Sequence, residues 1–199
     1  MEYSASMVSC LFWLQESRKT AQLMSKGLSI SEIRTVAVDE NIYQVRTAER
    51  AIRIAGATYK RLNALQSELL QHFISADLAT ARLILLISIM QTDLLFYEFM
   101  HTVFRQSIVL GESVLSERAV NVFFDAKIAE SPEVAGWTEQ AIKKLKQVYI
   151  KNLVESGLLS SAKDRKIIAP MIDYRLQNLL RAAGLLPYLS ALTGEDYDG

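Results

Sequence analysis

The sequence predicts a nearly all-helical protein with one small β-hairpin toward its C-terminal end. Glycine and proline, which turn-rich β proteins need most, number only 8 and 3 among 199 residues. Apolar residues recur at helical spacing through most of the chain, and they make up 50% of it. Charged residues contribute 22%, which is the composition of an ordinary folded protein.

Capping and stop residues divide the first third of the chain into three helices. Gly27 ends the first, because glycine readily adopts the left-handed conformation that closes a helix. Ser29 and Glu32 have the spacing of a capping box and open the second. Thr47 is the expected N-cap of the third. The predicted helices cover 7–26, 31–38 and 47–65, with a break at 39–44.

The middle of the chain, from about 64 to 109, contains three helices that are apolar on most sides. Such helices lie at the centre of a fold. The most apolar run, Leu83–Met90, has eight residues, whereas a bilayer span needs about 20. We therefore expect a buried core helix here and no membrane segment. Gly111 ends this block.

The last third follows the order helix, helix, hairpin, helix, which is typical of a winged helix. Ser116–Glu130 is the first of these helices, and a break at 131–133 follows. Thr138 is a plausible N-cap and Gly157 a plausible C′ residue of the second. Beyond them we expect strands at Leu158–Ser160 and Lys166–Ile168 around a turn at 161–165, a helix at 174–184 and an apolar tail at 185–192.

These patterns predict three regions fused in one compact body. Residues 1–65 form a helical unit of helix-turn-helix type, 66–111 the apolar centre, and 112–199 a winged-helix-like unit. The formal net charge is zero, yet the charges are segregated. Residues 18–61 contain nine Lys and Arg against four Asp and Glu, and residues 138–166 contain seven against three. The segment between them is acidic, with four against nine over residues 67–137.

Two predicted helices have a basic outer side, and this is the main functional signal. On the helix after Thr138, the side opposite the apolar stripe has only lysines and amides: Gln140, Lys143, Lys144, Gln147 and Lys151. Further candidate cations lie elsewhere on this helix, just after it or earlier in the chain: Arg46, Arg50, Arg53, Lys60, Arg61, Lys146, Lys163, Arg165 and Lys166. Because lysine binds phosphate as a point charge, we expect binding to the backbone of double-stranded DNA with weak sequence preference. The arginine cluster at 46–61 is either a second nucleic-acid contact or a protein-docking surface.

Residues that would indicate catalysis or metal binding are scarce. His72 and His101 lie in apolar helices and lack metal-ligand spacing to each other or to Cys10. No glycine-rich phosphate loop, nucleophile elbow or metalloprotease motif occurs. We expect no catalytic residues, no metal and no cofactor. The single cysteine rules out an internal disulfide and is typical of a cytoplasmic protein.

Over nearly its whole length the chain resembles the BrxA family, the small accessory proteins of BREX bacteriophage-defence systems. Five segments account for the resemblance: residues 3–29, 40–62, 79–106, 137–159 and 167–173. The family was formerly described as a putative inner-membrane protein, a description that the Leu83–Met90 run would explain. Lys143, Lys144, Lys146, Lys151 and the arginine cluster match the family's basic segments.

The resemblance implies a NusB-like helical fold, DNA binding, and a role in host-genome methylation and phage exclusion. The resemblance implies no catalytic residue in this chain. The implied function is a non-enzymatic DNA-binding subunit with methyltransferase or ATPase partners from the same system. Two alternatives stay open: an RNA-binding factor of the NusB antitermination type, and a protein-interaction adaptor. The oligomeric state is not predicted.

Overall fold

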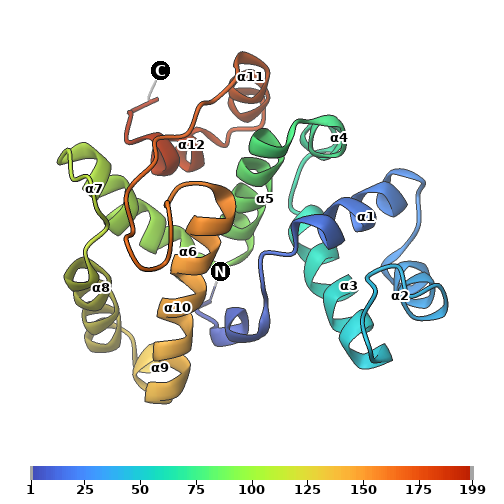
Figure 1. Ribbon diagram of the computed structural model, residues 1–199, viewed down its shortest axis with the longest axis horizontal. Coiled ribbons are helices and arrows are strands. Elements are labelled where there is room, and N and C mark those ends of the chain that lie inside the picture. Colours follow the sequence, from blue (N-terminus) through green and yellow to red (C-terminus); the bar gives the residue numbers. More distant parts are fainter. Residues whose placement is uncertain (1, 198–199) are drawn as a thin grey trace.

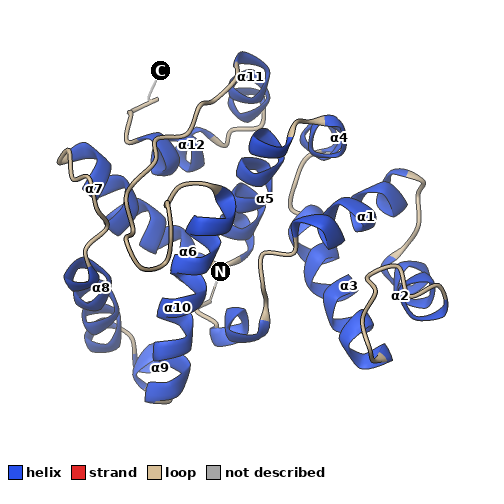
Figure 2. Ribbon diagram, viewed as in Figure 1, coloured by secondary structure: helices blue, strands red, loops and turns tan. Residues whose placement is uncertain are grey.

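The computed structural model describes residues 2–197, which are mainly helical and contain no sheet (Figures 1 and 2). This agrees with the all-helical class predicted from the sequence. Helices and connecting loops alternate along the whole described chain, and the two ends lie on the larger of its two visible parts (Figure 1).

The N-terminal part is a short 3-10 helix followed by three helices that pack around their own core. These elements are η1 (Ala5–Ser9), α1 (Leu14–Ser25), α2 (Ile30–Asp39) and α3 (Ala48–Leu62). Buried side chains from α2, α3 and the connecting segments form a separate hydrophobic cluster, against which Leu23 and Met24 of α1 pack: Trp13, Ile33, Ala37, Tyr43, Ala51, Ile54 and Ala55. The predicted caps are confirmed, since both hydrogen bonds of the Ser29–Glu32 capping box form and Thr47 Oγ1 accepts from the Arg50 amide. The domain boundaries themselves stay a prediction.

The predicted continuous helix from Met7 to Lys26 is wrong. The chain leaves η1 at Cys10, runs extended, and enters α1 only after Trp13, whose φ of 55° is left-handed. The reason lies in another part of the sequence. The buried guanidinium of Arg61 donates to the carbonyl oxygens of Leu11 and Phe12, which a continuous helix would have used internally.

The apolar centre is built from consecutive helices: α4 (Ser67–Ser75), α5 (Leu78–Thr92), α6 (Leu94–Phe99), a π-helical turn η2 (Met100–Phe104) and α7 (Arg105–Val109). Every residue from Leu83 to Met90 is buried, as expected for a core helix. Among the described residues no single helix has both the length and the hydropathy of a membrane span. The α5 helix passes that test only when joined to the following α6–α7 segment across a bend of 117°.

The helices α8 (Glu117–Glu130) and α10 (Glu139–Ser156) run in roughly opposite directions and are joined at one end by the short helix α9 (Pro132–Ala135) (Figure 1). The break predicted at 131–133 is thus largely a single helical turn, because Ser131 caps it and Pro132 occupies its first position. The predicted ends of α10 are confirmed. Thr138 Oγ1 accepts from the Ala141 amide at 3.1 Å, and Gly157 adopts a left-handed φ of 87°.

The predicted β-hairpin does not form. The segment after α10 makes an isolated antiparallel bridge between Leu159 and Ile167, and a second bridge joins Lys166 to Val114. Successive amides of an antiparallel segment point to opposite sides, so the Ile168 amide donates to Leu158 while the Ile167 amide donates to Ser113. The pairing stops there because the Lys166 amide donates to the Ser160 hydroxyl and not to a backbone carbonyl across the turn. The hydrogen bonds are therefore divided between two neighbours, and neither pairing is long enough to make a strand.

The chain ends with α11 (Tyr174–Ala182) and α12 (Leu186–Thr193). Asp173 caps α11, accepting from the Leu176 amide at 2.8 Å. The segment predicted as an apolar tail is the helix α12. It is fixed by packing, since Leu189, Ala191 and Leu192 are buried in the main core.

Replacing Thr138 with alanine should lower the free energy of unfolding by about 1 kcal/mol, because the Ala141 amide loses its side-chain acceptor at the start of α10. Thr138→Ser retains the hydroxyl and should lie within about 0.5 kcal/mol of the parent. Urea denaturation followed by circular dichroism measures both. Equal stability of the alanine and serine variants would show that the cap contributes nothing.

Candidate nucleic-acid interface

The outer side of α10 presents a basic surface. The core-facing residues Ile142, Leu145, Val148, Tyr149 and Leu153 are buried. The five polar residues predicted on the opposite side are all exposed: Gln140, Lys143, Lys144, Gln147 and Lys151. The predicted division of this helix into a buried apolar side and an exposed polar side is therefore confirmed. Whether the surface binds nucleic acid stays a prediction.

The lysines of this surface are mostly free of carboxylate partners. Lys151 forms an exposed pair with Glu155 at 3.5 Å, one helical turn away. Within the described chain, Lys143 and Lys144 have no carboxylate within ion-pairing distance. Two neighbouring cations without counter-charges can bind an anionic partner without first breaking an ion pair, and the counterions released on binding favour the complex.

Lys146 lies apart from the outer surface and is half-buried. Its Nζ donates to Asn121 Oδ1 of α8 at 2.8 Å and lies 5.5 Å from the centre of the Phe124 ring. This side chain therefore bridges α10 and α8, and its ammonium group is held in a fixed position. A fixed cation loses less conformational entropy on binding an anion than a free surface lysine does.

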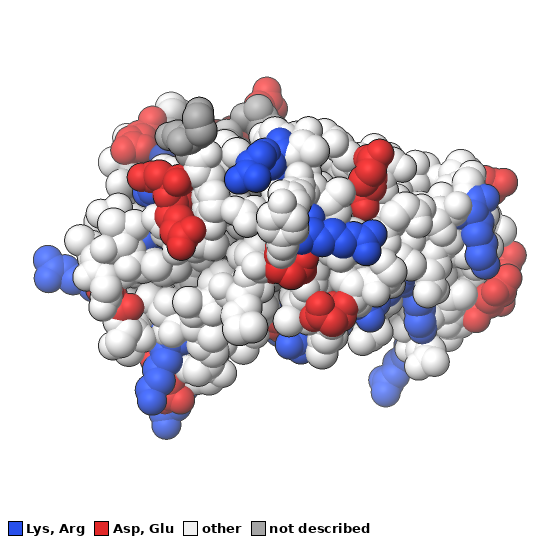
Figure 3. Space-filling model, turned by 90° about the horizontal axis from the view of Figure 1, so that it is seen from above, with Lys and Arg blue, Asp and Glu red and all other residues white. Residues whose placement is uncertain are grey.

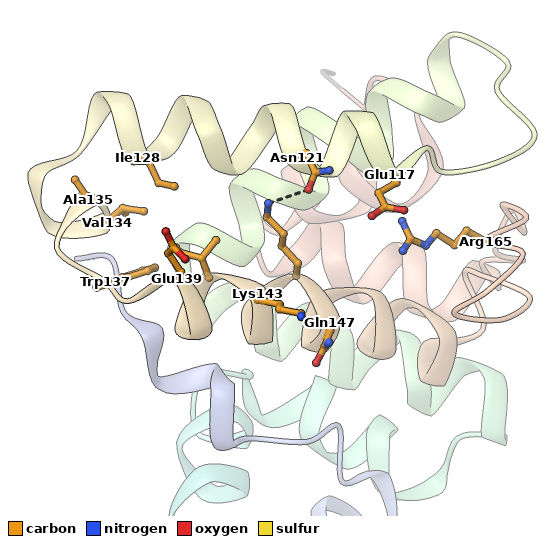
Figure 4. Close-up of a pocket in the computed structure, with 12 residues that line it drawn as sticks. Glu117, Asn121, Ile128, Val134, Ala135, Trp137, Glu139, Lys143, Gln147 and Arg165 are labelled. Carbon is orange, nitrogen blue, oxygen red and sulfur yellow. Dashed lines mark hydrogen bonds between the residues drawn. The ribbon is translucent and has the colours of Figure 1, made fainter.

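Between α8 and α10 runs an open groove with a volume of about 670 Å³ (Figure 4). The α9 end is mainly apolar (Figure 4), and Lys146 of α10 donates across the groove to Asn121 of α8. The lining residues are Glu117, Asn121, Ile128, Val134, Ala135, Trp137, Glu139, Ile142, Lys143, Lys146, Gln147 and Arg165. The groove thus joins part of the α10 surface to the turn that follows α10.

The turn at 161–165 contributes the remaining C-terminal cations. Lys163 and Lys166 are exposed, whereas Arg165 is half-buried with a left-handed φ of 50°. The carbonyl of Arg165 accepts from the Leu115 amide, and its Nε donates to Ala162. These bonds hold the residue at the groove, where its side chain points toward Glu117 (Figure 4).

The arginine cluster of α3 is only partly on the surface. Arg46, Arg50, Arg53 and Lys60 are exposed. The prediction that Arg61 faces outward is wrong: its exposed fraction is 4%. The Arg61 guanidinium binds two backbone carbonyls and lies 6.0 Å from the Trp13 ring centre. It is a structural residue, and burial lowers its pKa.

Sequence reasoning missed the α8 side of the groove. Glu117, Asn121 and Ile128 come from a helix that showed no basic or aromatic pattern. Only the fold brings them opposite α10, so no local signal could have identified them. Trp137 lies in the segment that the sequence singled out, although its place at the apolar end was not predicted.

The two histidines occupy different environments. His101 is exposed, whereas His72 is buried with neither ring nitrogen hydrogen-bonded. Burial lowers the pKa of His72, and the nearby positive charge of Arg175 lowers it further. Among residues 2–197, no three side chains of His, Cys, Asp or Glu gather as ligands for one metal ion.

On the face where α11 and α12 lie, the described residues form no comparable basic surface (Figure 3). Seen from above, this face shows Lys and Arg interspersed with Asp and Glu, with broad uncharged areas between them (Figure 3). Mixed charges of this kind produce little net attraction for a polyanion. The outer side of α10, with its unpaired lysines, therefore differs in charge from the face that α11 and α12 form.

Comparison with known proteins gives consistent matches over nearly the whole chain. The family model described as BrxA matches residues 1–184. A curated relative from Bacillus cereus (strain H3081.97), described as BREX protein BrxA, is 37% identical over 194 residues, covering 97% of each chain. The crystal structure of an uncharacterized protein from Magnetospirillum magneticum superposes with a TM-score of 0.84, covering 98% of this chain and 100% of that one. At 19% identity, the latter shows a shared fold.

Proposed function

The chain belongs to the BrxA family, and on that premise we propose that it is a non-enzymatic DNA-binding accessory subunit of a BREX bacteriophage-defence system. Its partners would be double-stranded DNA and other proteins of the same system, such as methyltransferase or ATPase subunits. It would act in the cytoplasm.

One observation supports DNA binding above the others. Lys143 and Lys144 project from the exposed side of α10 and have no carboxylate within ion-pairing distance in the described chain. Lysine contacts the phosphate backbone without reading bases, so the proposed binding depends on charge and has weak sequence preference. The neighbouring Gln140 and Gln147 could add limited base contacts, since glutamine can pair with adenine.

The NusB-like bundle, which the family resemblance implies, and the winged-helix arrangement, which the sequence pattern suggests, belong to this proposal. The turn at 161–165 would take the place of a wing without being a hairpin. A NusB-type RNA-binding factor is the main alternative, because the same lysines would attract RNA. An adaptor that binds only proteins is the other.

A panel of three fluorescent probes separates these possibilities: duplex DNA, single-stranded DNA and a structured RNA, each titrated with the full chain at the same salt concentration. We expect the tightest binding to duplex DNA, measured by fluorescence anisotropy. Tighter binding to RNA would replace the proposal with the antitermination-type alternative. Binding to none of the three at about 150 mM salt would favour the adaptor.

A further inference from the structure

A second concave site lies between the N-terminal helices and the central core. It is a cleft of about 380 Å³ bordered by η1, α3 and the C-terminal end of α5, with Arg34 reaching in from α2. Its lining residues are Ser6, Met7, Cys10, Arg34, Ile52, Arg53, Gly56, Ala57, Lys60, Arg61, Ile89, Thr92 and Asp93. The volume is within the range of small-molecule sites, about 300–1,000 Å³. Sites of this kind often lie where two parts of a fold meet.

Three exposed cations converge on the mouth of the cleft. Arg53 and Lys60 are seven residues apart on α3, so they lie on the same side of the helix two turns from each other. Gly56 lies between them, and Arg34 crosses over it. A Cβ atom at Gly56 would be 3.4 Å from Arg34 Nη2. The glycine therefore allows the Arg34 guanidinium to approach the helix closely.

None of these three cations has a carboxylate within ion-pairing distance in the described chain. Like charges held near one another repel, and the repulsion is relieved when an anion binds among them. Four basic residues line the cleft, counting the buried Arg61, against a single acid. The charge of the cleft is therefore suited to an anion with more than one negative charge.

The single acid, Asp93, lies at the inner side of the cleft and is 7% exposed. One of its oxygens, Oδ1, accepts from the Phe96 amide at 2.9 Å and so caps α6. Burial raises the pKa of Asp93, and the positive charges of Lys60 and Arg61 oppose that rise. A buried carboxylate of this kind can accept a hydrogen bond from a ligand hydroxyl or amino group.

We propose that this cleft binds a small molecule bearing a pyrophosphate group. Arg34, Arg53 and Lys60 hold the phosphates at the mouth, and Asp93 accepts a hydrogen bond from the rest of the ligand. Nucleoside diphosphates and triphosphates have this combination of groups. The site goes beyond the proposed DNA binding, because a cleft of about 380 Å³ with a buried carboxylate inside it matches a small molecule in size and polar groups.

Isothermal titration calorimetry of the full chain with inorganic pyrophosphate and with ADP tests the proposal. We expect both to bind, and we expect Arg34→Ala with Arg53→Ala to weaken binding at least about 10-fold. The matched control is Arg46→Ala with Arg50→Ala, which removes two exposed arginines at the start of α3 outside the cleft lining. This control should bind both probes like the parent.

A second variant fills space in the cleft without removing any charged residue. Gly56→Leu should also abolish pyrophosphate and ADP binding, because its side chain would occupy the position of Arg34 and part of the cleft. Circular dichroism establishes that each variant is folded.

Three results would overturn the proposal. The first is no heat of binding for either probe at millimolar concentration. The second is an equal loss of binding in the Arg46 and Arg50 control, which would indicate nonspecific attraction to α3. The third is displacement of bound pyrophosphate by duplex DNA together with a matching loss of DNA affinity in the Arg34 and Arg53 variant. That would make the cleft a DNA backbone contact.

Discussion

Replacing Lys143 and Lys144 with glutamate is expected to weaken duplex DNA binding by about 100-fold or more, equivalent to roughly 3 kcal/mol. The change removes two unpaired cations from the exposed side of α10 and puts two negative charges in their place. Each glutamate would then repel the phosphates that the lysine attracted. Neither side chain contributes to the core, so the free energy of unfolding should be nearly unchanged.

The matched control reverses two exposed cations elsewhere, Lys26 at the end of α1 and Arg181 near the end of α11. This control has the same net charge as the α10 variant. It should retain at least about one-third of the parent affinity for duplex DNA, because dissolved salt screens charges that lie far from the bound DNA. If both variants lost affinity equally, the attraction would come from total charge and not from α10.

Replacing Arg61 with methionine should lower the free energy of unfolding by about 2–4 kcal/mol. The Arg61 Nη1 donates to two main-chain carbonyls, at 2.8 Å for Leu11 and 3.2 Å for Phe12. Methionine fills similar space but leaves both acceptors without this donor, and each buried unsatisfied group costs about 1–3 kcal/mol. Removing a desolvated charge offsets part of this loss. Urea denaturation of the two proteins measures the difference.

Lys60→Met provides the comparison, because Lys60 is the exposed neighbour of Arg61 on α3. It should change the free energy of unfolding by less than about 0.5 kcal/mol. Arg61→Lys should fall between parent and methionine variant, since one ammonium reproduces the guanidinium geometry poorly. An Arg61→Met protein as stable as the Lys60→Met protein would show that the extended segment before α1 does not depend on this side chain.

The sequence predicted helix ends well wherever the determinants are local. The capping box of Ser29 and Glu32, the N-caps Thr47 and Thr138, and the left-handed Gly157 are all present in the structure. Each depends on residues within one helical turn, so spacing alone is enough to identify them. The basic side of α10 was predictable for the same reason, since it follows from one helical period.

The failures arise where distant segments decide the outcome. Arg61 has the spacing of a surface residue on α3, yet it is buried and its guanidinium donates to the backbone carbonyls of Leu11 and Phe12, which come from a distant part of the chain. The same contact breaks the first predicted helix. The predicted hairpin ends after one bridge, where the Lys166 amide donates to the Ser160 hydroxyl, and its other side pairs with the segment around Ser113, far earlier in the chain. Contacts of this range leave no periodic signal in the sequence.

The salt dependence of duplex DNA binding tests the central claim most directly. Anisotropy titrations of the full chain between 50 and 200 mM salt, in the parent and in the Lys143→Glu, Lys144→Glu variant, give two log–log lines. If α10 binds phosphates, the logarithm of the parent's association constant should fall steeply and linearly with the logarithm of the salt concentration. The variant loses about two phosphate contacts, so the slope of its line should be shallower by roughly 0.9 for each. A parent affinity that does not change with salt, or equal slopes in the two proteins, would contradict the assignment of α10 as the DNA-binding surface.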